Sequence, residues 1–299
     1  MALEWTTLPA TLDLLGECPV WDHATQTLYW TDIPGKALKS WHPQSGEHRA
    51  WPMPDEVGSF ALRQQGGAIL AMRSGFALFD FTTRELKPLP SPDYDQTKMR
   101  FNDGRCGPDG RFYVGTMYEP RGRQEGRLYR LDTDLTWTEL PDTYAVVSNG
   151  LAFSRDGKTM YHSDSAGSIV NVHDFDATTG NIGPRRTFAT VPRPVEVGGV
   201  KLGRPDGAAI DEQDYYWSAM YEGQRIVRFA PDGSIDRDIP FPIRCPTMIC
   251  FGGEHLDTLF VTTSRNGRPA AELALQPDAG KVFVAKVDVR GVDEPKFRG

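Results

Sequence analysis

The chain has 299 residues, of which 39% are hydrophobic and 24% are charged, and its formal net charge is -7. This acidic balance disfavours nucleic acid and anionic membrane surfaces, so we expect neither as a partner. The first residues show no basic stretch followed by an unbroken apolar one, and no run of about 18 apolar residues occurs in the sequence. We therefore predict a soluble, cytoplasmic protein.

Short apolar strands separated by polar turns recur along the chain. Helical periodicity is almost absent, and Gly, Pro and Asp-Gly pairs interrupt the apolar runs, which indicates strands and hairpins. Strand-turn-strand units recur roughly every 40–55 residues, at residues 19–32, 60–73, 104–117, 151–164, 208–220 and 248–263. Most of these units are followed by a further strand pair, at residues 126–132, 168–176, 224–233 and 281–289.

This repeat is typical of the four-stranded blades of a β-propeller. We predict an all-β fold with one domain over residues 1–299, a six-bladed β-propeller in which segment 3–8 adds a strand to the last blade and closes the ring. The Asp-Gly pairs at 109–110, 156–157 and 232–233 are predicted to form type I′ hairpin turns, because Gly tolerates a positive φ. Two β-sandwiches would also supply many short strands, but they do not explain six copies in one phase.

The four cysteines are Cys18, Cys106, Cys245 and Cys250. They show no CxxC spacing, and four cysteines in a chain of this length do not make a disulfide framework. We expect buried free thiols. A bridge between Cys245 and Cys250 stays open at this stage, because the two are close in sequence.

One position recurs in phase at the start of all six units. Counting back four residues from the last apolar residue of each first strand gives Glu17, Gly58, Asn102, Asn149, Asp206 and Thr247. The innermost strands of a propeller face the central axis, so these positions form a ring at one mouth of the channel. Four of the six carry carboxylate or carboxamide oxygens, which suit a divalent cation. Without a cation, the gathered carboxylates would repel one another.

Simpler explanations exist for some of these residues. Asn149-Gly150 and Asp206-Gly207 are also common turn dipeptides, but separate turns do not predict a shared phase. Arg100 lies two residues before Asn102, which places a guanidinium at the same mouth, where it would hydrogen-bond a polyhydroxylated ligand. The sequence contains no GxSxG elbow, HExxH helix or phosphate-cradling glycine loop, so serine hydrolase, zincin and nucleotide chemistry are unsupported.

Two neighbouring features complete this interpretation. His162 and Asp164 lie in a second strand, where we expect hydrogen bonds within the blade. Segments 118–126 and 192–203 are expected to rim the mouth and to limit the size of the substrate.

Several motifs resemble a known family. They are GECPVWD at 16–22, RFNDG at 100–104, SNGLAFSRDGKTMY at 148–161, RPDG at 204–207 and CFGG at 250–253. In this order, over nearly the whole chain, they resemble the SMP-30/gluconolactonase/regucalcin family, and most of all its bacterial sugar lactonases, such as xylonolactonase or arabinonolactonase.

The resemblance implies one divalent metal ion, which would be calcium, zinc, manganese, magnesium or ferrous iron. Glu17, Asn149 and Asp206 fall on the family's metal ligands, and Asp206 also matches the residue proposed there as the general base. The implied reaction is metal-dependent hydrolysis of a small-molecule sugar lactone, a pentono- or hexonolactone, to the aldonic acid.

The resemblance also assigns the substrate contacts. Arg100 and Asn102 fall on substrate-binding positions, and Glu119 stands near a third such position. Cys18 replaces the small residue usual after the glutamate, so we expect its thiol beside the metal site.

Two alternatives use the same residues. One is a regucalcin-like protein that binds calcium for regulation, without turnover. The other is a hydrolase of phosphotriesters or aryl lactones on the same site.

Overall fold

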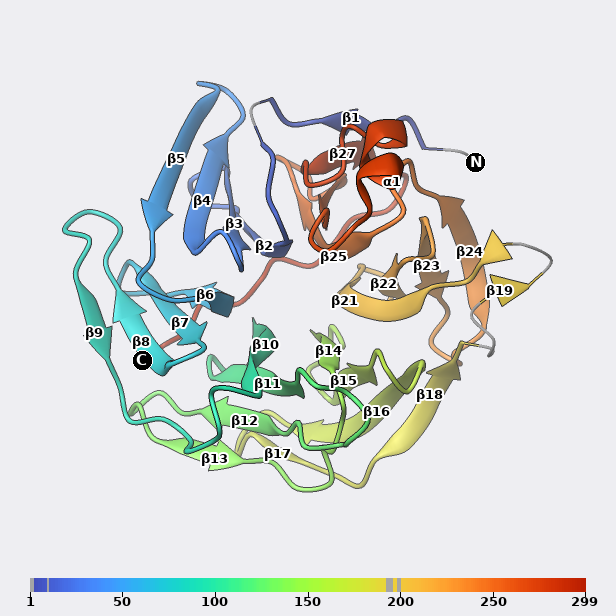
Figure 1. The fold of residues 1–299 in the computed structure, drawn as a ribbon. Helices are drawn as coiled ribbons and strands as arrows, with labels where there is room; N and C mark the ends of the chain where they lie inside the picture. The colour runs from blue at the N-terminus through green and yellow to red at the C-terminus, as the bar shows by residue number, and fades with distance from the viewer. Residues whose placement is uncertain (1–2, 10, 192–195, 198–199) are drawn as a thin grey trace.

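The computed structural model describes residues 3–9, 11–191, 196–197 and 200–299. Their strands form six sheets in a ring around a central axis (Figure 1). From the axis outward, the first three blades contain β2 (Gly16–Asp22), β3 (Thr27–Asp32), β4 (Ala37–His42) and β5 (Glu47–Pro52); β6 (Val57–Leu62), β7 (Ala68–Met72), β8 (Gly75–Phe79) and β9 (Leu86–Pro88); and β10 (Met99–Cys106), β11 (Phe112–Tyr118), β12 (Leu128–Leu131) and β13 (Trp137–Glu139).

The other three blades continue the ring in chain order. They contain β14 (Ser148–Phe153), β15 (Thr159–Asp164), β16 (Ile169–Asp176), β17 (Asn181–Ile182) and β18 (Arg186–Thr190); β21 (Arg204–Ile210), β22 (Tyr216–Tyr221), β23 (Arg225–Phe229) and β24 (Ile235–Pro240); and β25 (Pro246–Gly252), β26 (Thr258–Thr263), β27 (Phe283–Lys286) and β1 (Thr6–Thr7). In the fourth blade, β16 pairs with both β17 and β18. A small separate hairpin joins β19 (Glu196–Val197) and β20 (Val200–Lys201).

The N-terminal strand β1 completes the last blade. Thr6 of β1 pairs with Val284 of β27, and Thr7 pairs with Phe283, in antiparallel register. The first strand of each blade contacts the first strand of the next, including β2 with β25. The prediction of a six-bladed propeller closed by segment 3–8 is therefore confirmed.

Every innermost strand carries a β-bulge near its start. The register shifts between Glu17 and Val20 in β2, and equivalent shifts occur in β6, β10, β14, β21 and β25. A bulge adds an unpaired residue and re-aims its side chain, so the repeated bulge turns the ring positions toward the channel. In β14 the bulge is made possible by Gly150, whose φ is +61°.

The apolar faces of neighbouring blades form the core. Between the fifth and sixth blades, for example, the fully buried Trp217 meets Phe251 edge-to-face at 5.6 Å between ring centroids. Such layers fix the spacing of the blades and thus the width of the channel.

The C-terminal segment crosses the centre of the ring, as the red trace in Figure 1 shows. Gly291 bridges to Asp211 of the fifth blade, and Phe297 bridges to Arg63 of the second. The Phe297 ring is fully buried in the core, and its backbone N–H donates to Leu62 O at 2.8 Å. This segment closes the end of the channel where the innermost strands finish.

The structure differs from the sequence analysis at the Asp-Gly turns and in one short helix. Gly110, Gly157 and Gly233 have φ of +77°, +67° and +85°, but the aspartates before them do not have positive φ, so the predicted type I′ turns are wrong. At the second of these sites the Gly157 N–H donates to Ser154 O, which closes a turn that ends in a glycine of left-handed conformation. A helix, α1 (Ala270–Leu275), lies between β26 and β27, and its six residues are too few to show helical periodicity.

The cysteines are the buried free thiols expected from the sequence. All four cysteines are free and buried, so Cys245 and Cys250 are not bridged. Among the helices of the described ranges, none combines the length and the apolar character needed to cross a membrane.

Candidate functional site

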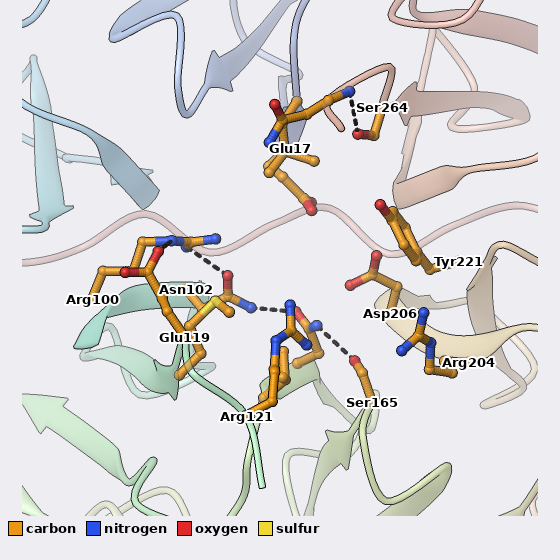
Figure 2. A pocket seen from close by; sticks show the side chains of 15 residues that line it. Glu17, Arg100, Asn102, Glu119, Arg121, Ser165, Arg204, Asp206, Tyr221 and Ser264 are labelled. Carbon is orange, nitrogen blue, oxygen red and sulfur yellow. Dashed lines mark hydrogen bonds and ion pairs between the residues drawn. The ribbon is translucent and has the colours of Figure 1, made fainter. Parts of the chain in front are cut away.

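A pocket of about 290 Å³ opens at the mouth of the channel where the innermost strands begin. It brings together every candidate residue of the sequence analysis, and Figure 2 shows the labelled side chains converging on its centre. These residues are Glu17, Arg100, Asn102, Glu119, Asn149 and Asp206. Gly58 and Thr247, the other two ring positions, do not line it; Thr247 instead donates its hydroxyl to Gly16 O.

A chain of hydrogen bonds fixes the amides of the pocket. Arg100 Nη1 donates to Asn102 Oδ1 at 2.7 Å, and Asn102 Nδ2 donates to Asn149 Oδ1 at 2.9 Å. Asn149 Nδ2 then donates to Ser165 Oγ at 2.8 Å, and Ser165 Oγ donates to Pro205 O. Each amide is thereby held in one orientation, and the Asn149 oxygen keeps a second lone pair for a ligand.

The two carboxylates of the ring interact with each other; Asp206 is buried and Glu17 is half-buried. Burial raises the pKa of Glu17, and the negative charges of Asp206 and Asp103 add to the rise. Burial likewise raises the pKa of Asp206, with a further contribution from Asp103. Among the described residues, no side chain or backbone N–H donates a hydrogen bond to the Asp206 carboxylate, although the charges of Arg204, Arg121 and Arg100 partly offset the rise of its pKa. The charge of Arg100 and a backbone hydrogen bond at Cys18 act in the same way on Glu17, but burial outweighs these contributions at both carboxylates.

Asp103 adds a third negative charge beneath the pocket. Burial raises its pKa to about 6, while the Leu151 N–H donates to its Oδ2 at 2.8 Å. Its Oδ1 is buried without a hydrogen-bond partner among the described residues. A cation bound near Glu17 and Asp206 would offset the repulsion among these carboxylates and Asp103.

The donor set fits a hard divalent cation. Glu17 and Asp206 offer carboxylate oxygens, and Asn149 offers an amide oxygen with a lone pair to spare. Within the described residues there is no group of three or more His, Cys, Asp or Glu side chains suited to a metal ion. The candidate set has only two carboxylates, and its third oxygen comes from an amide.

Glu119 is held in place from the second blade. Arg73 Nη2 lies 2.8 Å from Glu119 Oε1, and Arg73 Nη1 donates to Glu119 Oε2 at 2.9 Å. Arg73 also pairs with Glu56 at 2.7 Å, and Arg100 Nε approaches Glu119 Oε1 at 3.5 Å. Hydrogen bonding to Arg73 is the main cause that lowers the pKa of Glu119, so this carboxylate is ionised and fixed at the edge of the pocket.

The sequence analysis missed several lining residues, and a regular offset would have found three of them. Arg100 was selected because it lies two residues before a ring position. The same offset from Glu17, Asn149 and Asp206 gives Leu15, Val147 and Arg204, all of which line the pocket. The ends of the second strands supply another set, namely Met117, Ser165, Tyr221 and Ser264. Arg121, also missed, comes from the loop after β11, for which no periodic signal exists.

Segment 118–126 contributes Glu119 and Arg121 to the pocket, as expected for a rim. Segment 192–203 lies partly outside the described residues. The expectation for Cys18 is wrong: its thiol does not line the pocket but contacts the backbone of Phe60 at 3.3 Å in the core between blades. Burial raises the pKa of this thiol, which keeps it protonated and unreactive.

His162 and Asp164 act within the blade, as predicted. His162 Nε2 lies 2.8 Å from Ser148 Oγ, and Asp164 Oδ1 accepts a hydrogen bond from the Val147 N–H at 3.1 Å. Both bonds brace the start of β14, next to Asn149.

Comparison with known proteins identifies the family. The model of the SMP-30/gluconolactonase/LRE-like region matches residues 15–265. The chain belongs to this family. A 6-deoxy-6-sulfogluconolactonase from Pseudomonas putida is 42% identical over 286 residues, which cover 96% of each chain. Regucalcin from Oryctolagus cuniculus is 33% identical over 291 residues, or 95% of each chain.

The fold is shared with a solved member of the SMP-30/gluconolactonase family. The structure of a calcium-binding protein, regucalcin, from Agrobacterium tumefaciens has a TM-score of 0.93 at 26% identity, covering 100% of this chain and 99% of that one. The matched family region contains all six candidate side chains, whereas the C-terminal segment that closes the channel lies beyond it.

Proposed function

We propose that this protein hydrolyses a sugar lactone, an aldonolactone of the pentono or hexono class, to the aldonic acid with the help of one divalent cation. The observation that carries the proposal is the pocket: two carboxylates, an oriented amide and a buried guanidinium converge in one cavity large enough for a monosaccharide. The partner is a small molecule, and we propose no nucleic-acid or membrane partner and a cytoplasmic location.

The comparisons support this reaction class. The relative with 42% identity over nearly the whole chain is named a 6-deoxy-6-sulfogluconolactonase. Relatives named regucalcin, and a solved regucalcin titled a calcium-binding protein, support a divalent cation.

Glu17, Asn149 and Asp206 would hold the cation, since all three line the same pocket and carry side-chain oxygens. When bound, the cation would polarise the lactone carbonyl and stabilise the negative charge that develops on its oxygen. The amide chain from Arg100 to Ser165 keeps Asn149 in a fixed orientation, so the ligand oxygen needs no reorganisation.

The residues of the chain supply the remaining steps. Asp206 takes a proton from the attacking water, whose oxygen bonds to the lactone carbon. The bond from that carbon to the ring oxygen then breaks, and the ring oxygen is protonated to a hydroxyl. The product is an aldonate, and one proton is released to solvent in each turnover.

Arg100 and Asn102 orient the sugar. The Arg100 side chain is buried, and Nη1 is engaged by Phe101 O and Asn102 Oδ1. Its other N–H groups remain for the ring hydroxyls, with Glu119 beside them as an acceptor. Such contacts would hold the lactone carbonyl next to Asp206, and holding the reacting groups in this orientation accelerates the reaction.

A second candidate function uses the same pocket. The relatives named regucalcin favour a calcium-binding protein without turnover. Such a protein needs Glu17 and Asp206 but not the proton transfer, so measured turnover separates the two functions.

Asp206→Asn tests the assignment, because it removes the base and one ligand charge while keeping the shape of the side chain. We expect this substitution to lower the rate of lactone hydrolysis by about 100-fold or more. Asn149→Ala should lower the rate by a comparable factor. The matched control is Asp232→Asn, another Asp-Gly aspartate of the same blade, which is exposed on the outer hairpin between β23 and β24. Wild-type rates in Asp206→Asn, with wild-type thermal stability, would refute the proposal.

A further inference from the structure

The positive charges of the pocket are unevenly paired. Three arginines line it, Arg100, Arg121 and Arg204, and they differ in what neutralises them. The acidic partners of each guanidinium determine whether its charge is balanced within the protein or is available to a ligand.

The charge on Arg100 is balanced. Arg100 pairs with Glu119, which also pairs with Arg73, and Arg73 pairs in turn with Glu56. Two arginines and two glutamates thus form a neutral cluster. Arg100 is left to donate hydrogen bonds to neutral groups such as hydroxyls.

The charge on Arg204 belongs to a cluster with an excess cation. Arg204 pairs with Glu222, and Arg268 pairs with the same Glu222 at 2.7 Å. Arg268 also pairs with Glu272 at 2.7 Å, and Arg244 shares Glu272 at 3.1 Å. Three arginines therefore share two glutamates, which leaves one positive charge in excess. The Arg204 end of this cluster is the end that lines the pocket.

Arg121 forms no salt bridge within the described part of the chain, although its charge acts on Asp206 from a longer distance. It follows β11 on the loop that also carries Glu119, and its side chain lines the pocket. Figure 2 shows the guanidinium groups of Arg121 and Arg204 both turned toward the interior, on either side of Ser165. The pocket thus presents one guanidinium without a salt bridge, that of Arg121, and the Arg204 end of a cluster with one excess positive charge.

This excess stands out against the rest of the molecule. The protein has a formal net charge of -7, which would repel an anionic substrate at long range. A cation held by Glu17 and Asp206 would cancel their two negative charges. Arg121 and Arg204 would then make the occupied pocket net positive, and a guanidinium matches the geometry of an oxyanion such as sulfonate, phosphate or carboxylate.

We propose that the lactone bound in this pocket carries an anionic group on a carbon away from the lactone carbonyl, and that Arg121 and Arg204 hold this group. The inference rests on the proposed function and specifies its substrate class. The rival explanation is that the two arginines only offset the repulsion between Glu17 and Asp206, since both lower the pKa of Asp206. The rival predicts equal effects on charged and neutral lactones.

The test compares lactones that differ only at the terminal carbon. The cation-loaded enzyme is assayed with gluconolactone and with three analogues. In these analogues the terminal hydroxyl is replaced by a sulfonate or a phosphate, or the terminal hydroxymethyl group is replaced by a carboxylate. We expect kcat/KM to be at least about tenfold higher for one or more of the anionic lactones, and this ratio to fall as salt is added. The analogue with the highest ratio identifies the anion.

Arg121→Gln and Arg204→Gln should each lower the ratio of anionic to neutral kcat/KM by about tenfold, the effect of one lost charge-assisted contact. Arg123→Gln is the matched control, because Arg123 is exposed on the same loop and does not line the pocket; its ratio should match the wild type.

Other outcomes overturn the inference in distinguishable ways. A wild-type preference for the neutral lactone, or equal losses on neutral and anionic lactones in both arginine variants, would refute the anion site and leave the lactonase assignment standing. Failure to turn over any lactone would refute the proposed function and this inference with it.

Discussion

Loss of the Glu294 carboxylate should destabilise the propeller measurably. Glu294 lies in the C-terminal segment that crosses the channel, and it pairs with Arg105 of β10. Arg105 also donates to Leu151 O at 2.9 Å and to Ala208 O at 2.6 Å, so it joins three blades and the C-terminal segment. Burial lowers the pKa of Arg105, but the charges of Glu294 and Asp103 outweigh it and raise the pKa. Glu294→Ala removes the nearer of these two anions.

The magnitude follows from burial. Breaking a buried ion pair by removing one partner costs about 3–5 kcal/mol, because a buried charge is left uncompensated. The side chains of Arg105 and Glu294 are 9% and 15% exposed, and Asp103 stays nearby, so we expect the lower end, about 3 kcal/mol. For a chain of this length, about 2 °C of melting temperature is lost for each kcal/mol, which gives a fall of about 6 °C.

The assay is thermal unfolding followed by circular dichroism at one fixed scan rate. The control is Asp293→Asn, because Asp293 is the exposed neighbour of Glu294 and forms no ion pair with the described residues; its melting temperature should stay within about 1 °C of wild type. Equal melting temperatures for Glu294→Ala and the control would show that the C-terminal segment does not stabilise the ring through this pair.

Three further predictions concern the site and its surroundings. Arg73→Gln frees Glu119, so we expect KM for the lactone to rise about tenfold with a smaller change in kcat; a loss confined to kcat would contradict this role. Asp103→Asn should weaken divalent-cation binding, measured by calorimetry on metal-stripped protein, by about tenfold, and unchanged affinity would argue against Asp103 as a contributor to the cation site. Burial raises the pKa of Asp13 from 3.8 to about 6, so the stability this group contributes is present below pH 3.8 and is lost as the pH rises through 6. The free energy of unfolding of wild type, relative to Asp13→Asn, should therefore fall by about 1.4 kcal/mol between about pH 5 and about pH 7.5 in urea titrations, and a constant difference would refute the raised pKa.

The repeat explains why so much was accessible from the sequence. Six copies in one phase determine both the fold and the ring positions, since equivalent residues of a propeller occupy equivalent places around the axis. Glu17, Asn102, Asn149 and Asp206 were therefore placed at one mouth without any structure. The recurring bulge, which turns these side chains inward, maintains the shared phase.

The remaining features depend on contacts that periodicity does not encode. Arg73 and Glu119 are 46 residues apart, and their pairing follows from the packing of two blades. Arg121 lies on a loop of irregular conformation, with its own φ at +64°. Cys18 follows Glu17 directly, yet its thiol lies in the core while the carboxylate lines the pocket. Sequence adjacency was a poor guide there, because successive side chains of a strand point to opposite faces.

The most direct test of the central claim is acid release from a lactone, followed with a pH indicator, by metal-stripped protein to which one divalent ion is added at a time. The lactones are neutral and anionic pentono- and hexonolactones. We predict that acid release exceeds the spontaneous rate with at least one pair of ion and lactone, and that it returns to the spontaneous rate when the ion is chelated. Tight binding of an ion by the pocket, with no turnover of any lactone, would contradict the assignment and favour a binding or regulatory role for the carboxylates around Glu17.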